Sequence, residues 1–204
     1  MSPVCNGVVI ALVGSGPRER PRRADARRNY ERLLEQAKLA FGEFGADASL
    51  DEIARRAGVA SGTLYRHFPT RLDLIEAVLE EQMRALADLG RDLATADDEL
   101  DAVSTWLRAA LRHGLAYRGL AAAVMNSALD RGNDRVAAWH TEVFEVGSAL
   151  LDRARRSGAV VARTDDADVL KTVGAIAWAC QDDPDGEARA ERMLALVVRG
   201  LQSR

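Results

Sequence analysis

The distribution of proline constrains the fold of this chain more than any other feature of its sequence. No proline occurs between Thr70 and Asp183, and that stretch is rich in Ala, Leu, Arg and Glu, which favour helices. The prolines lie near the ends or at one early break: Pro3, Pro17, Pro21, Pro69 and Pro184. With 204 residues and 48% hydrophobic content, the chain can bury a substantial core. We therefore predict an all-α fold.

Apolar residues recur at the helical period along most of the chain, between polar or glycine-bearing turns. Gly45 ends the first predicted helix, and Ser49 with Glu52 predicts a capping box at the start of the second. Thr70 is the predicted N-cap of a long fourth helix, whose pattern loosens at residues 90–98. Later helices are predicted at residues 100–115, 119–129, 136–157, 167–180 and 187–201.

Charge is divided unevenly along the chain. Residues 17–71 hold 12 Lys and Arg against 8 Asp and Glu, a net charge of +4. Residues 72–204 hold 16 basic against 23 acidic residues, a net charge of −7. This asymmetry is typical of a DNA-facing module joined to a domain that does not contact phosphate.

The sequence indicates a cytoplasmic protein. The apolar run at residues 8–13 is too short to span a bilayer and lacks a basic leader, so we expect no membrane partner. Cys5 and Cys180 are far apart and belong to no CxxC or Cys/His spacing, and the three histidines share no ligand spacing. We therefore expect reduced thiols, no bound metal and no cofactor.

The segment most informative about function is the pair of short helices around Gly58. The glycine lets the backbone turn sharply, while Ala54 and Val59 are small enough for two helices to cross closely, as in a helix-turn-helix. The exposed side of the second short helix offers hydrogen-bonding side chains suited to bases and phosphates: Ser61, Thr63, Tyr65, Arg66 and His67. The spacing favours a DNA reader, and the alternative is an ordinary helical hairpin with a solvated polar face.

Residues 49–71, with the sequence SLDEIARRAGVASGTLYRHFPTR, closely resemble the signature of the tetracycline-repressor (TetR) family. The family's pattern for the preceding helix is matched around Ala37, Phe41 and Gly45. This long, ordered signature is more specific than a helix-turn-helix alone. The resemblance is tight over residues 30–79 and looser afterwards, and it implies that the chain binds double-stranded DNA.

The resemblance also assigns roles to individual positions. By motif position, the residues that approach bases are Ser61, Gly62 and Tyr65, and those that contact phosphates are Ser49, Thr63, Tyr65, His67 and Arg71. Two positions depart from the family pattern. Arg71 replaces a commoner lysine and keeps its positive charge, whereas Leu72 replaces a frequent acidic residue and is expected to alter packing.

The resemblance further implies about nine helices, a homodimer formed mainly by the last two, and a ligand cavity in the C-terminal part. We divide the chain into a flexible basic tail at residues 1–25, a helix-turn-helix domain at residues 26–72 and a regulatory and dimerisation domain at residues 73–204. The last helix carries apolar residues around an arc too wide for one intramolecular contact, which independently favours a partner subunit.

Aromatic, methionine and histidine side chains on the later helices are the candidates for binding a small-molecule effector. They are Trp106, His113, Met125, Trp139, His140, Phe144 and Trp178. The large apolar side chains would line the cavity, and the histidines would supply polar anchors within it. The alternative interpretation is that each apolar member is an ordinary core residue.

These patterns together predict a DNA-binding transcriptional regulator: a repressor released from a palindromic operator by a small apolar ligand. The alternative is an architectural DNA-binding protein that responds to no ligand. An enzyme is disfavoured because the sequence holds no glycine-rich phosphate loop and no GxSxG, HExxH or CxxC motif.

Overall fold

The computed structural model describes residues 19–117, 120 and 134–202. Within these ranges the chain forms eight α-helices and one 3-10 turn, and its only β pairing is a single bridge between Val160 and Gln202. The elements are α1 (Glu19–Phe44), η1 (Gly45–Asp47), α2 (Leu50–Arg56), α3 (Ser61–His67), α4 (Arg71–Leu93), α5 (Glu99–Ala116), α7 (Asp134–Arg156), α8 (Asp166–Cys180) and α9 (Gly186–Leu201). This confirms the all-α prediction. The helix predicted at residues 119–129 lies outside the described residues.

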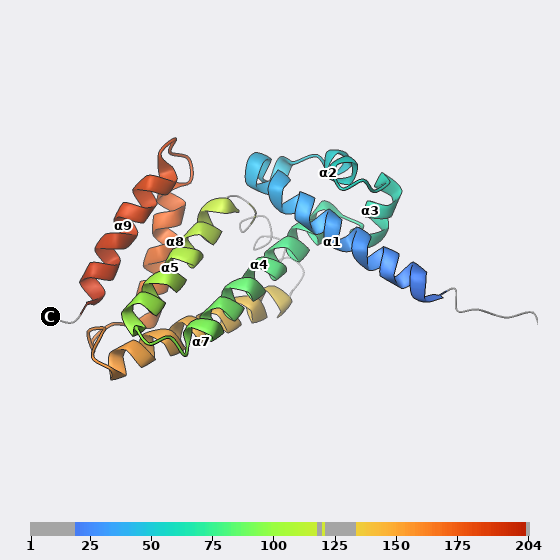
Figure 1. Ribbon diagram of the computed structural model, residues 1–204. Helices are drawn as coiled ribbons and strands as arrows, with labels where there is room; N and C mark the ends of the chain where they lie inside the picture. The colour runs from blue at the N-terminus through green and yellow to red at the C-terminus, as the bar shows by residue number, and fades with distance from the viewer. Residues whose placement is uncertain (1–18, 118–119, 121–133, 203–204) are drawn as a thin grey trace, which may run out of the picture.

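Two groups of helices share one long connecting helix. Helices α1, α2 and α3 pack together at one end of the molecule, and α4 runs from them into the second group (Figure 1). There α4 packs mainly against α7 and α5, while α8 and α9 pack against each other and against α5. Helix α4 therefore belongs to both parts of the structure.

Each group of helices encloses its own hydrophobic core. The first core combines residues of α1 to α3 with the N-terminal half of α4, and its fully buried members include Phe41, Leu64 and Leu74. The second core joins the C-terminal half of α4 to α5, α7, α8 and α9, and its fully buried members include Trp106 and Leu107. Helix α4 contributes to both cores and therefore connects them directly.

Helix α1 begins earlier than the sequence predicted. We expected a flexible tail through residue 25, but the helix starts at Glu19. Residues 25–31 carry exposed pairs of opposite charge one turn apart: Arg27 Nε donates to Glu31 at 2.8 Å, and Arg28 pairs with Asp25. Such pairs stabilise a solvated helix at residues 25–31, and the helix that contains them extends back to Glu19.

Helix α4 continues through Gly90, where the sequence pattern begins to loosen, and ends at Leu93. A Cβ atom on Gly90 would lie 2.2 Å from Val146 Cγ1 and 2.8 Å from Trp106 Nε1. The glycine is needed here for a close approach to α5 and α7, and it does not end the helix. The sequence pattern loosens because glycine carries no side chain, while the backbone stays helical to Leu93.

Candidate DNA-binding interface and ligand pocket

The start of α2 is capped by the predicted serine, but by only half of the predicted capping box. Ser49 Oγ accepts a hydrogen bond from the backbone N–H of Glu52 at 3.3 Å. The Glu52 carboxylate does not return to the cap, because it accepts hydrogen bonds from Arg55 at 2.7 Å and from Arg56 at 2.9 Å. These bonds lower the pKa of Glu52 to about 2. The two guanidinium groups compete successfully for the carboxylate because each adds an opposite charge to its hydrogen bond with Glu52.

The turn between α2 and α3 has the geometry that the sequence predicted. Gly58 adopts a φ of 63°, in the left-handed region that favours glycine. The backbone N–H of Val59 then donates to the carbonyl of Ala54 at 2.9 Å, which closes the turn. Ala54 and Leu64 are buried between the helices. The sharp reversal presents the outer face of α3 to solvent.

The side chains expected to read DNA lie together along α3. Gly62, Tyr65 and Arg66 are exposed, and the others, Ser61, Thr63 and His67, are partly exposed. Arg66 Nη2 donates to Thr63 Oγ1 at 2.9 Å, which orients both side chains on the surface of the helix. The His67 ring packs edge-on against Tyr30 of α1, with 5.9 Å between centroids. The result is one continuous polar face on a protruding short helix.

Arg71 and its neighbours fix the start of α4 beside this face. Thr70 and Asp73 form a complete capping box: Asp73 Oδ2 accepts from the Thr70 backbone N–H at 2.7 Å, and Thr70 Oγ1 accepts from the Asp73 N–H at 3.2 Å. Arg71 Nη1 donates to the carbonyl of Ala46 at 2.9 Å and also to that of Ala48. Arg71 thus ties α4 to the η1 turn, a role that the motif did not reveal.

A mainly apolar cavity of about 460 Å³ lies among α4, α5, α7 and α8. This volume falls within the range typical of small-molecule sites. Its lining residues are Leu79, Met83, Leu86, Trp106, Ala110, His113, Gly114, Tyr117, Trp139, His140, Val143, Phe144, Leu170, Val173 and Gly174.

Five of the seven predicted ligand-binding residues line this cavity: Trp106, His113, Trp139, His140 and Phe144. Met125 lies outside the described residues. Contrary to our expectation, Trp178 does not line this cavity, and 73% of it is exposed. Helix α8 turns Val173, Ile176 and Ala177 towards the second core, which leaves Trp178 on the outer face.

Residues of α4 and Tyr117 also line the cavity, although the sequence did not indicate this. Leu79, Met83 and Leu86 line the cavity and recur at the helical period in the sequence. That period shows that they share one face of α4, but it does not distinguish residues packed in a core from residues that line a cavity. Leu79, Tyr117 and Trp139 also pack in the first core, whereas Leu86 and Trp106 belong to the second. The cavity therefore lies at the boundary between the two cores.

The polar end of the cavity holds two histidines and a tyrosine. Burial, with a contribution from nearby His140, lowers the pKa of His113 to about 4, so His113 is neutral at pH 7. Its Nδ1 atom is buried without a hydrogen-bond partner. Burial and the carboxylate of Glu81 raise the pKa of Tyr117. The site thus combines apolar walls with a neutral imidazole at His113 and a phenol at Tyr117.

Comparison with known proteins identifies the family. The C-terminal domain model described as "Transcriptional regulator SbtR-like" matches residues 98–203, and the model described as "Bacterial regulatory proteins, tetR family" matches residues 33–78. The chain belongs to the TetR family. This is a family of transcriptional regulators, and the second match covers the helix-turn-helix of α2 and α3.

Solved structures share this TetR-family fold. A TetR regulator from Streptomyces coelicolor is 34% identical, with a TM-score of 0.72, over 85% of this chain and 98% of its own. One from Mycobacterium vanbaalenii is 32% identical, with a TM-score of 0.64, over 89% and 99%. The curated regulator TtgW of Pseudomonas putida is 39% identical over 64 residues, 31% of this chain, and the match spans about half of that relative (48%).

A membrane-spanning helix is not found among residues 19–117, 120 and 134–202. None of the helices there is both long enough and apolar enough to cross a bilayer.

Proposed function

We propose that this TetR-family protein is a homodimeric repressor that leaves a palindromic operator when a small, largely apolar molecule occupies the cavity. The observation that carries the proposal is the course of α4. Its N-terminal half packs in the core of the DNA-binding helices, and its C-terminal half lines the cavity. One helix therefore connects the two sites and could couple them if it adopts two arrangements that DNA and ligand favour differently.

The polar face of α3 supports the DNA-binding part of the proposal. In this arrangement Ser61, Gly62 and Tyr65 approach bases in the major groove, while Thr63, His67 and Arg66 reach the flanking phosphates. Ser49, at the start of α2, and Arg71, at the start of α4, add backbone contacts. The remaining donors of Arg71 are available for phosphate while Nη1 holds the η1 carbonyls.

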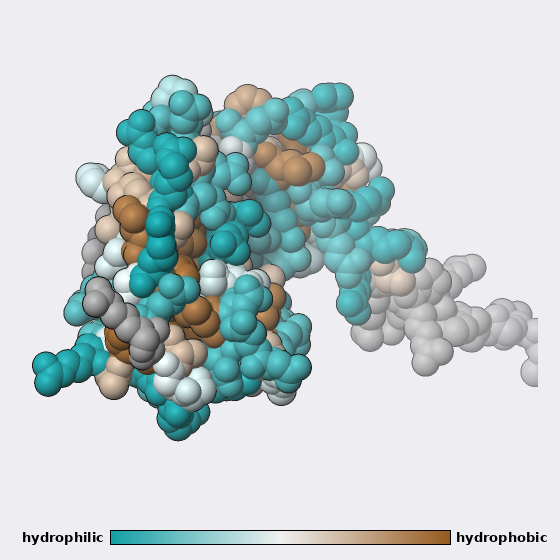
Figure 2. Space-filling model, turned by 60° about the vertical axis from the view of Figure 1, so that its left-hand side comes forward, coloured by the Kyte–Doolittle hydropathy of each residue, from teal (hydrophilic) through white to brown (hydrophobic). Residues whose placement is uncertain are grey.

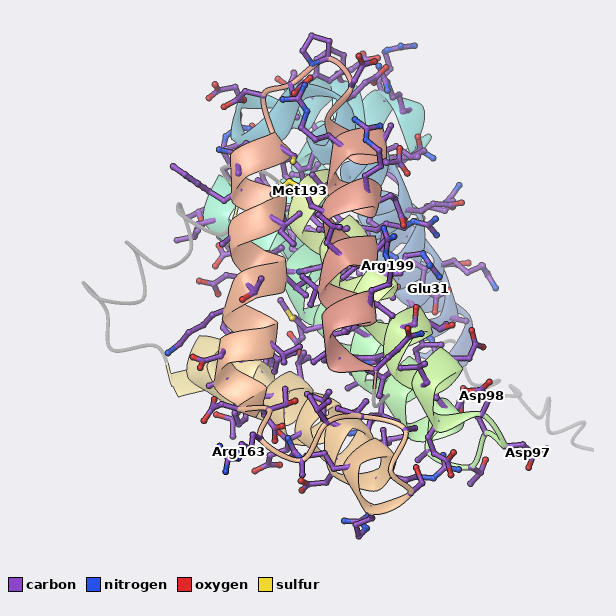
Figure 3. The ribbon with its side chains drawn as sticks, turned by 90° about the vertical axis from the view of Figure 1, so that its left-hand side faces the viewer. Glu31, Asp97, Asp98, Arg163, Met193 and Arg199 are labelled. Carbon is purple, nitrogen blue, oxygen red and sulfur yellow. The ribbon has the colours of Figure 1, made fainter. Side chains whose placement is uncertain are left out.

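The outer face of α8 and α9 supports the homodimer. These helices run side by side, with Met193 labelled between them in Figure 3. Figure 2 shows hydrophobic side chains exposed among hydrophilic ones on this side of the molecule. On this face, Trp178 of α8 is 73% exposed and Leu196 of α9 is 64% exposed. Leu194 and Leu201, also on α9, are instead buried in the chain's own core. Pairing this face with its symmetry mate would give a four-helix, two-fold contact.

The cavity supports the effector part of the proposal. Trp106, Trp139 and Phe144 provide aromatic walls, and His113 with His140 provides polar anchors. Since the cavity lies between the two cores, a bound molecule would change their separation and tilt α4. That tilt would alter the spacing of the two α3 helices in the dimer, so that they no longer match half-sites one helical turn or a multiple apart.

The test combines operator selection with an effector screen. A duplex selected from a random pool should contain two inverted half-sites and bind two chains. Compounds that raise the melting temperature should then be titrated into the protein–operator complex. We expect at least one apolar compound to quench tryptophan fluorescence and to weaken operator binding about 5-fold to 150-fold. A single half-site would contradict the dimer, and binders that leave operator affinity unchanged would contradict the coupling. A broad screen without binders would favour the ligand-independent alternative.

A further inference from the structure

Trp106 has an unusual position for a residue that lines the cavity. Trp106 lies in the middle of α5 and is only 1% exposed, so it is almost completely buried even though it borders the cavity. The indole Nε1–H donates to the backbone carbonyl of Leu86 on α4 at 3.0 Å. Leu86 lines the same cavity. Trp106 therefore forms part of the cavity wall and is also hydrogen-bonded directly to the α4 backbone.

The indole is held in a slot between two glycines on facing helices. A Cβ on Gly90 of α4 would lie 2.8 Å from Trp106 Nε1, and a Cβ on Gly147 of α7 would lie 2.4 Å from Cη2 and 2.6 Å from Cζ3. The pyrrole edge thus contacts α4 and the benzo edge contacts α7. Carbon atoms in contact normally lie about 3.5–4.0 Å apart, so the slot admits this indole only because both glycines lack side chains.

We infer that Trp106 is the positioning residue through which an occupied cavity moves α4. A molecule that displaces the indole would break its hydrogen bond to Leu86 and open the α4–α7 contact that it fills. Closely packed interfaces shift between discrete arrangements and do not deform continuously, so a small displacement would re-seat α4 as a unit. The inference rests on the proposed function, because it specifies how ligand binding would reach the DNA-binding helices.

The N-terminal half of α4 would carry this movement to α2 and α3. Leu74, Ile75 and Val78 are buried in the first core with the residues of α1 to α3. Arg71 adds hydrogen bonds from the start of α4 to the η1 turn. A tilt of α4 about the Trp106 contact would therefore rotate α1, α2 and α3 together as one unit, without changing how these helices pack on one another.

Gly147→Ala tests this inference without any ligand. The new Cβ would push the indole out of its slot from the α7 side, so the variant should imitate the ligand-bound state. We expect its affinity for the selected operator to fall about 5-fold to 150-fold in the absence of ligand, and its tryptophan emission to shift to longer wavelength. Gly42→Ala on α1, where a Cβ meets nothing within 4 Å, is the matched control and should bind like the wild type.

A double variant separates the collision from general damage to α7. Trp106→Phe removes the Nε1–H donor to Leu86 and the benzo edge that fills the α4–α7 contact, so it should weaken operator binding by itself, and adding Gly147→Ala to it should weaken binding no further. An affinity of Gly147→Ala equal to wild type would overturn the inference, as would a double variant whose loss of affinity is the product of the two single losses, because independent damage to α7 would add to the effect of Trp106→Phe. Either result leaves the proposed function standing if a screened compound still releases the wild-type protein. Failure of the wild type to bind any duplex would refute the proposed function itself.

Discussion

Gly62→Ala offers the sharpest separation of DNA binding from folding in this protein. Gly62 is exposed on α3, and a Cβ built there meets nothing within 4 Å. Alanine is favoured over glycine inside a helix by up to about 1 kcal/mol, so the substitution should stabilise the free protein slightly. For a chain of this size, ~1 kcal/mol corresponds to a rise in melting temperature of about 2–4 °C.

The same methyl group should weaken operator binding. We propose that Gly62 faces the bases, where the helix and the groove wall meet as closely as atoms in a protein interior. An extra methyl group in a well-packed contact costs about 1–3 kcal/mol, which corresponds to an affinity loss of about 5-fold to 150-fold. Fluorescence anisotropy with a labelled operator duplex at one fixed salt concentration measures this loss.

Gly42→Ala provides the control for Gly62→Ala as well. It makes the same chemical change in an exposed part of α1 with empty space around the new atom, and it should raise the melting temperature without changing operator affinity. If both variants bind operator like the wild type, Gly62 does not face DNA and the assignment of the α3 face is wrong.

Two further predictions concern the regulatory part of the chain. Leu196 on α9 is 64% exposed, and Leu196→Asp should yield monomers in sedimentation analysis and lose operator binding. Leu39 on α1 is 59% exposed, and the control variant Leu39→Asp should remain dimeric. If both variants remain dimeric, the dimer interface lies elsewhere. The pKa of His113 is lowered from 6.5 to about 4, so the unfolded state takes up its proton at higher pH than the folded state and stability should fall as pH drops from 7 to 4. His113→Leu should show a smaller loss across this window in thermal unfolding, and an unchanged slope would mean that His113 is solvated.

Local features of this protein followed from its sequence because the interactions that produce them span only a few residues. The Gly58 turn, the Thr70 cap of α4 and the end of α1 before Gly45 all depend on backbone geometry or on hydrogen bonds within one helical turn. The long ordered signature of residues 49–71 added the family, and with it the face of α3 that carries the polar side chains.

Some local hydrogen bonds differ from those that the sequence predicts, because several groups compete for the same partner. Ser49 and Glu52 have the spacing of a capping box, yet the Glu52 carboxylate pairs with Arg55 and Arg56 instead. Arg71 finds carbonyl partners at Ala46 and Ala48, more than 20 residues earlier in the chain. A motif names the groups that could interact, but relative strength and the path of the chain decide which of them do.

The cavity was decided by tertiary structure. Trp106 and Trp178 look alike in the sequence, as large apolar residues on predicted helices, but one is held between Gly90 and Gly147 while the other lies on the outer face of α8. The helical period specifies which residues share a face of a helix, so the sequence alone determined the apolar face of each helix. Whether an apolar face packs in a core or lines a cavity depends on how separate helices cross. Cavities form where helices from distant parts of the chain pack without filling the space between them.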